Sequence, residues 1–188
     1  MKKIGITGSL ASGKTTASKI LSSGKGPLFS ADAVVKKLYK DKFFRRHISK
    51  KFKIKNISKI KSIIKSKILL DRSNINKLEK IIHPLVRSKM KKFIQKNKKR
   101  DFIFLEIPLL IESKLMKNFD TIFYIKAKKS LRLRRFRQKG GKKHLFQALN
   151  NKQLKDAFKI KHCDHVIVNE GNLKILKKNL LDIFKKYE

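Results

Sequence analysis

The chain has 188 residues, of which 51 are Lys or Arg and 13 are Asp or Glu, so its formal net charge is +38. The single cysteine, Cys163, excludes an intramolecular disulfide framework and a cysteine-based zinc quartet. No apolar run approaches the ~20 residues that a membrane span needs and no secretory signal precedes the first apolar strand, so we expect a soluble, cytoplasmic protein without a membrane partner.

The positive charge has two explanations. Such an excess is typical of proteins that bind nucleic acid or anionic membranes. Here, however, lysines are spread along the whole chain and alternate with apolar residues, as in Lys50-Lys51-Phe52-Lys53-Ile54-Lys55, which is the pattern of solvated helix faces. We therefore favour a compositional bias and expect no specific nucleic-acid partner. Under either explanation the charge attracts phosphorylated substrates.

The N-terminal half begins with alternating strands and helices. A short apolar strand at residues 3–7 leads through a glycine-bearing turn into a helix at 14–22. A second short strand is predicted at 27–30, and Ala31-Asp32 lies at its end. Apolar residues then recur at helical spacing over about 33–100, so we expect a helical insertion there.

The C-terminal half returns to the same alternation. Phe102 to Leu105 is a continuous apolar run, as expected of a parallel strand buried on both faces. Further strands are predicted at 121–125 and 165–168, helices at 129–138 and 143–158, and a closing helix with its apolar stripe at Leu173, Leu176, Leu180, Ile183 and Phe184. This alternation predicts an α/β fold with a doubly wound parallel sheet.

The segment Gly8-Ser9-Leu10-Ala11-Ser12-Gly13-Lys14-Thr15, here called the phosphate loop, fits every fixed position of the Walker A pattern. Gly8 and Gly13 let the backbone curl so that successive N–H groups converge on phosphate oxygens. Lys14 can reach the β- and γ-phosphates, and the Thr15 hydroxyl is the natural magnesium ligand. We predict that the loop, with Thr16 in the first turn of the helix, binds a nucleoside triphosphate and Mg2+.

Two acidic residues follow predicted strands. Asp32 lies at the carboxyl end of the second strand, where doubly wound sheets bind their ligands, so it is a candidate to orient or deprotonate the phosphoryl acceptor. The alternative is a helix N-cap. Glu106 follows the most apolar strand and is a candidate to hold magnesium through water. Glu112 is expected to cap a helix or to pair locally.

Two further candidates are single residues. His83, followed by Pro84, falls inside the helical insertion and is either structural or a contact to the acceptor. Asn169 lies just past the last strand and is either a contact to the nucleotide base or a turn residue.

Four arginines, Arg132, Arg134, Arg135 and Arg137, precede Gly140-Gly141. Arginines beside a glycine hinge suit a lid that closes over phosphates, because guanidinium groups bind phosphate in bidentate fashion. The spacing spreads them around one helix, so they cannot all point inward. We expect Arg134, with Arg137 or Arg135, to face the phosphates and the others to lie at the surface.

Taken in order, these motifs resemble those of the dephospho-CoA kinase family. The resemblance covers nearly the whole chain and rests on the phosphate loop, Ala31-Asp32, His83-Pro84-Leu85, Ile107-Pro108-Leu109-Leu110-Ile111-Glu112 and the segment from Cys163 to Gly171. It implies the fold of the nucleoside-monophosphate kinase group, with a core of residues 1–32, 101–128 and 159–188, a substrate insertion at about 33–100 and a lid at about 129–158.

The resemblance also implies an activity, the ATP-dependent phosphorylation of the ribose 3′-hydroxyl of dephospho-CoA. Asp32 matches the residue taken as the general base of the family, and His83, Pro108 and Leu109 match the acceptor side. Lys14 and Arg134 would stabilise the phosphoryl group during transfer, with ATP and Mg2+ as donor and metal.

The sequence departs from the family pattern at two places. Ser30 stands where the family carries the first Asp of Asp-Ala-Asp, so any role of that carboxylate in magnesium coordination is lost or passes to Asp32 and Glu106. The lid arginine is ambiguous between Arg137 and the position of Gln138. Alternative functions are another small-metabolite or nucleotide kinase on this scaffold, or a nucleic-acid-binding NTPase. A monomer is favoured.

Overall fold

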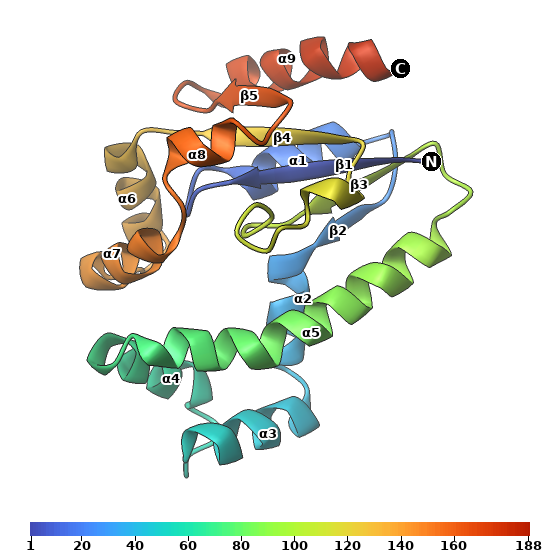
Figure 1. The fold of residues 1–188 in the computed structure, drawn as a ribbon. Helices are drawn as coiled ribbons and strands as arrows, with labels where there is room; N and C mark the ends of the chain where they lie inside the picture. The colour runs from blue at the N-terminus through green and yellow to red at the C-terminus, as the bar shows by residue number, and fades with distance from the viewer. The chain divides into compact units, whose positions relative to one another are not determined.

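The computed structural model describes all 188 residues and contains one five-stranded sheet in the order β2-β3-β1-β4-β5. Every neighbouring pair of strands is parallel, and β1 lies in the middle (Figure 1). The strands are β1 (Lys2–Gly8), β2 (Leu28–Ser30), β3 (Phe102–Glu106), β4 (Thr121–Lys126) and β5 (His165–Val168). The α/β class and the parallel sheet predicted from the sequence are confirmed.

Nine α-helices connect and follow the strands. They are α1 (Lys14–Ser22), α2 (Ala31–Leu38), α3 (Lys42–Phe52), α4 (Ile60–Leu70), α5 (Ser73–Lys96), α6 (Lys129–Gln138), α7 (Lys143–Lys152), α8 (Asp156–Ile160) and α9 (Leu173–Phe184), with short 3-10 turns η1 (Met116–Asn118) and η2 (Lys185–Tyr187). The helices predicted at 14–22 and 129–138 are confirmed at both ends. The single helix predicted at 143–158 is wrong, because the chain is extended at Gln153 and divides it into α7 and α8.

The chain divides into two compact units. One consists of Met1–Ser30 and Phe93–Glu188 and contains the sheet; the other, Ala31–Lys92, contains only helices, as the periodicity predicts. The functional divisions inferred from the family resemblance, a substrate insertion at about 33–100 and a lid at about 129–158, stay predictions.

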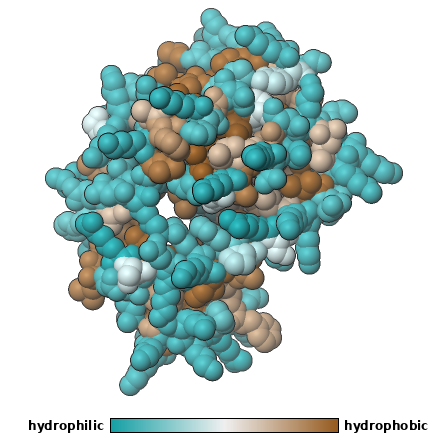
Figure 2. Space-filling model, viewed as in Figure 1, coloured by the Kyte–Doolittle hydropathy of each residue, from teal (hydrophilic) through white to brown (hydrophobic).

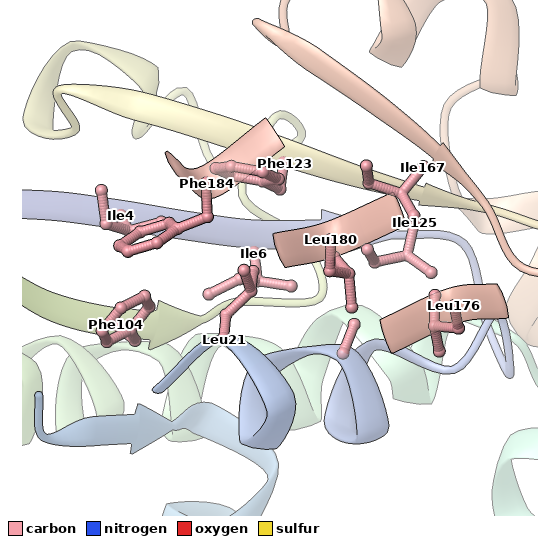
Figure 3. Packing of buried hydrophobic residues seen from close by; sticks show 11 residues of the cluster. Ile4, Ile6, Leu21, Phe104, Phe123, Ile125, Ile167, Leu176, Leu180 and Phe184 are labelled. Atoms are coloured by element: carbon pink, nitrogen blue, oxygen red, sulfur yellow. The ribbon is translucent and has the colours of Figure 1, made fainter. Parts of the chain in front are cut away.

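One face of the sheet is covered by α1 and α9, and their apolar side chains meet those of the central strands (Figure 3). Ile4 and Ile6 of β1 have no exposed surface, and neither do Leu21 of α1 and Leu180 and Phe184 of α9. Full burial of one such side chain contributes about 1.5–3 kcal/mol. This packing fixes β1, and therefore fixes where the phosphate loop begins.

The opposite face of β4 carries a polar cluster. Because side chains alternate along a strand, Tyr124 lies opposite to its neighbours Phe123 and Ile125, which belong to the α1/α9 core. Tyr124 is fully buried, and the ammonium group of Lys159, a fully buried residue of α8, lies 6.0 Å from the centre of its ring. This face therefore places the Tyr124 hydroxyl beside Ser9 of the phosphate loop, with Lys159 against the tyrosine ring.

The helical unit has its own apolar core, formed by one face each of α3, α4 and α5. The residues in it include Phe44, Ile48, Phe52, Ile60, Ile64, Ile68, Ile75 and Ile82.

Hydrophilic side chains dominate the molecular face seen in Figure 2, with apolar residues in scattered patches. No helix in the chain combines the length and the apolar character needed to cross a membrane.

Candidate active site

The phosphate loop joins the central strand β1 to α1 and requires glycine at two positions. Gly8 has φ 148° and Gly13 has φ 99°, both in the region that L-residues rarely adopt. A Cβ on Gly8 would clash with the carbonyl oxygen of Ile125, and one on Gly13 would clash with the side-chain amide of Asn169. Ala11 also has a positive φ, 60°, without being glycine. The backbone curl expected of the Walker A pattern is therefore present.

Lys14, the first residue of α1, folds back over the phosphate loop. Its side chain is buried, and Nζ donates to the carbonyl oxygen of Ser9 at 2.9 Å. The N-terminus of a helix attracts anions because its N–H groups and dipole point toward the ligand. Lys14 adds a full positive charge to that end of α1, so the loop is built to receive an anion.

Thr15 and Glu106 form the part of the site suited to a divalent cation. The Thr15 hydroxyl donates to Oε1 of Glu106 at 2.6 Å. Glu106 is fully buried, and its other oxygen, Oε2, has no hydrogen-bond partner. A hydroxyl and carboxylate oxygens are ligands that Mg2+ prefers, and a buried oxygen without a partner is what a bound cation or its water would satisfy. These residues fit magnesium.

Ser30 affects how much negative charge a divalent cation would meet at this site. Ser30 at the end of β2 is in register with Glu106 at the end of β3, so the two side chains occupy neighbouring strand ends. Because Ser30 stands where the family pattern has aspartate, Glu106 is the only carboxylate of this register pair. The charge that a cation would meet here comes from Glu106.

Two arginines of α6 contact the phosphate loop, and they are not the pair expected. Nη1 of the buried Arg132 donates to the carbonyl oxygen of Leu10 at 3.2 Å, and Nη1 of Arg135 donates to that of Ser12 at 3.3 Å. The expectation that Arg132 lies at the surface is wrong. Residues three apart share a helix face, and the face with 132 and 135 is the one that meets the loop.

Arg134 is exposed, and its predicted catalytic role stays a prediction. Burial, and secondly the neighbouring Arg134, lower the pKa of Arg135, which marks a guanidinium partly removed from water beside the loop.

Asn169 lies against the phosphate loop from the other side. It is buried, its backbone N–H donates to the carbonyl oxygen of Lys126 at 2.8 Å, and its side-chain Nδ2 donates to that of Ser12 at 2.8 Å. It is thus more than a turn residue, since its amide helps to hold the loop. The predicted contact between Asn169 and the nucleotide base stays a prediction.

Three residues that hold the front of the loop were not singled out from the sequence. Oε1 of Gln153 accepts from the backbone N–H of Leu10 at 2.9 Å. The Ser9 hydroxyl donates to Oδ1 of Asp156 at 2.5 Å and lies 3.0 Å from the Tyr124 hydroxyl. Burial raises the pKa of Tyr124, so this hydroxyl keeps its proton for hydrogen bonding.

Glu112 was expected to pair locally, and this is wrong. Its Oε1 lies 3.2 Å from Nζ of Lys159 and accepts from the backbone N–H of Leu154 at 3.3 Å. Lys159 is fully buried, so the ion pair neutralises a charge that would otherwise be costly. The pair fastens the segment around α8 to the turn after β3.

The residues predicted to act on the acceptor lie in both units. Pro108 and Leu109 follow β3, and the Thr7 hydroxyl donates to the carbonyl oxygen of Pro108 at 3.3 Å. In the helical unit, Asp32 is the second residue of α2, one position inside the helix, and its side chain is exposed. His83 helps to line a cavity of about 360 Å3 along α5. Contact of these residues with the acceptor stays a prediction.

Comparison with known proteins identifies the family. The model of the dephospho-CoA kinase family matches residues 2–174. The dephospho-CoA kinase of Bartonella henselae is 35% identical over 191 residues, which cover 98% of this chain and 97% of that protein.

Two solved structures share the fold. TT1252 from Thermus thermophilus has a TM-score of 0.76 at 24% identity, with 98% of this chain and 97% of the other covered. The dephospho-CoA kinase from Campylobacter jejuni has a TM-score of 0.64 at 20% identity, with 100% and 97% covered. The family match begins at β1 and ends in α9, so it includes the phosphate loop, the whole helical unit, most of the sheet unit and every site residue described above. This chain belongs to the dephospho-CoA kinase family.

Proposed function

We propose that this protein transfers the γ-phosphoryl group of ATP to the ribose 3′-hydroxyl of dephospho-CoA, giving CoA and ADP. The observation that carries the proposal is a complete phosphate loop, with Lys14, Thr15 and Glu106 in place, in a chain that belongs to this family over residues 2–174. Phosphoryl transfer depends mainly on positioning and on electrostatic stabilisation, and the loop supplies both.

The donor side is assigned to the phosphate loop. The N–H groups of the loop bind the β-phosphate, and Lys14 moves its ammonium group from the Ser9 carbonyl to the β- and γ-phosphate oxygens. We propose that Thr15 and Glu106 would hold Mg2+. The bound cation would neutralise negative charge on the phosphates during transfer.

The acceptor side is assigned to Asp32, His83, Pro108 and Leu109. The 3′-oxygen attacks the γ-phosphorus, the bond from that phosphorus to the leaving oxygen of ADP breaks, and the proton of the 3′-hydroxyl passes to the Asp32 carboxylate. Arg135 already lies beside the loop at Ser12, which favours it over Arg134 as the arginine that stabilises the transferring group.

A coupled assay of ADP release tests the function. It compares dephospho-CoA with other nucleosides, nucleotides and RNA as acceptors, and mass spectrometry identifies the product. Turnover with dephospho-CoA alone, yielding CoA, is the expected result. Release of ADP that is stimulated by RNA and needs no small acceptor would overturn the proposal in favour of a nucleic-acid-binding NTPase.

We further propose that the enzyme acts as a monomer, because the phosphate loop and the side chains that hold it all come from one chain. We also propose that it acts in the cytoplasm. Size-exclusion chromatography with light scattering tests the monomer at catalytic concentrations, and fractionation of cells tests the compartment.

A further inference from the structure

The peptide planes of the phosphate loop alternate in direction. In a trans peptide the C=O and the next N–H point to opposite sides. The carbonyl of Ser9 accepts from Nζ of Lys14 and from the N–H of Ser12, at 2.9 and 3.1 Å, so it faces the inside of the loop. The N–H of Leu10 therefore faces outward, and it donates to Oε1 of Gln153 at 2.9 Å.

The next peptides are turned the other way. The carbonyl of Leu10 faces outward to Arg132 at 3.2 Å, so the N–H of Ala11 faces inward. The carbonyl of Ser12 faces outward to Asn169 at 2.8 Å, so the N–H of Gly13 also faces inward. Side chains outside the loop thus hold the carbonyls away and leave two N–H groups pointing to where phosphate oxygens bind.

The two side chains at the front of the loop are themselves held in place. Arg132 also donates through Nη1 to Oδ1 of Asn150 at 2.8 Å and through Nε to the carbonyl oxygen of Ala127 at 3.2 Å, and its Nη2 lies 4.0 Å from Oδ2 of Asp156. Gln153 occupies the extended break between α7 and α8, which directs its amide to Leu10. Both also line a cavity of about 350 Å3 beside the loop.

We propose that Gln153 is a positioning residue, which presets the phosphate loop for the nucleotide without touching it, while Arg132 holds the neighbouring carbonyl of Leu10. The inference rests on the proposed function only in that the loop binds ATP. Without the acceptor oxygen of Gln153, the Ser9–Leu10 peptide loses one of the contacts that keep it in this orientation, namely the one on its N–H side, so part of the binding energy of the nucleotide is used to restore it.

The test compares three substitutions. Gln153→Met keeps the length of the side chain and removes the acceptor oxygen, whereas Gln153→Glu keeps an oxygen that can accept from Leu10. Gln147→Met is the matched control, because Gln147 is exposed on α7. Calorimetry without acceptor measures the Kd of Mg-ATP, and steady-state kinetics measure the KM of ATP and of dephospho-CoA.

Gln153→Met is expected to weaken ATP binding roughly three- to tenfold, the worth of one hydrogen bond, and to leave the KM of dephospho-CoA unchanged. Gln153→Glu is expected to stay within about twofold of the parent, as is the control. Hydrogen exchange provides a second measurement, in which the Leu10 amide loses protection in Gln153→Met and keeps it in Gln153→Glu.

The proposal is overturned if Gln153→Met binds ATP as tightly as the parent, if Gln153→Glu is as weak as Gln153→Met, or if the KM values of both substrates rise together. Because calorimetry requires no turnover, these results are distinct from a failure of the proposed function. A chain that did not phosphorylate dephospho-CoA could still show the expected loss of nucleotide affinity.

Discussion

Replacing Glu106 by glutamine should have opposite effects on the free protein and on the complex with Mg-ATP. Glu106 is fully buried, Oε1 accepts from Thr15, and Oε2 has no partner. A buried polar group without a partner costs about 1–3 kcal/mol, and a charged one more. Glutamine has the same shape, keeps an oxygen for Thr15 and is neutral, and a neutral amide costs less to bury than a carboxylate.

We therefore expect Glu106→Gln to raise the stability of the nucleotide-free protein by about 1–3 kcal/mol. At roughly 2–4 °C per kcal/mol for a chain of this size, Tm should rise by about 2–12 °C. In the presence of Mg-ATP the variant should instead be less stable than the parent, because it lacks the negative charge that holds the cation. The extra rise in Tm that magnesium adds to ATP alone should shrink, and turnover should require more magnesium.

Differential scanning calorimetry with no ligand, with ATP and EDTA, and with Mg-ATP measures both effects. Glu112→Gln is the matched control, because Glu112 also has a buried oxygen without a partner but is paired with the buried Lys159. Glu112→Gln removes the negative charge that compensates the buried ammonium group of Lys159, and it should destabilise the protein by about 3–5 kcal/mol. The reasoning is refuted if Glu106→Gln destabilises the free protein, or if magnesium stabilises it as much as the parent.

Four further outcomes are expected. Lys14→Ala should abolish turnover, whereas Asp32→Asn should preserve the Kd of ATP in calorimetry and remove most of kcat; near-full kcat in Asp32→Asn would exclude it as the base. Arg135→Ala should lower kcat more than Arg134→Ala, since only the former contacts the phosphate loop, and equal losses in the ADP-release assay would contradict this. Burial lowers the pKa of His165 below its ordinary 6.5, so the unfolded chain binds this proton more readily and stability is lost as pH falls below about 6.5. His165→Gln should therefore show a smaller fall in Tm between about pH 7 and 5 than the parent, and an unchanged fall would rule out this contribution.

The sequence was sufficient for features that depend on neighbours along the chain. The phosphate loop is a contiguous motif between a strand and a helix. The continuous apolar run at Phe102–Leu105 indicates a buried strand, because a surface strand would carry polar residues. Helical spacing likewise predicted helices over about 33–100, and every regular element in Ala31–Lys92 is a helix.

Features that depend on distant contacts could not be predicted in this way. Gln153 sits in a segment whose composition favours one continuous helix, and its side chain contacts Leu10, 143 residues earlier, so neither the break nor the contact follows from local sequence. The local sequence does not distinguish Arg132 from Arg134, because both are arginines of the same helix. Only the packing of α6 beside the loop makes Arg132 the buried one. Glu112 pairs with a lysine 47 positions later, beyond the reach of any local rule.

The central position of β1 determines when the sheet can form. Its partners β3 and β4 begin at Phe102 and Thr121, and the core that covers it is completed by Phe184 near the end of the chain. β1 is thus enclosed by segments far from it in the sequence, and we expect the sheet unit to fold through slow, non-local pairing. In the meantime Lys2 and Lys3 at the start of β1 place two positive charges beside its apolar residues, which discourages this exposed strand from pairing with another unfinished chain.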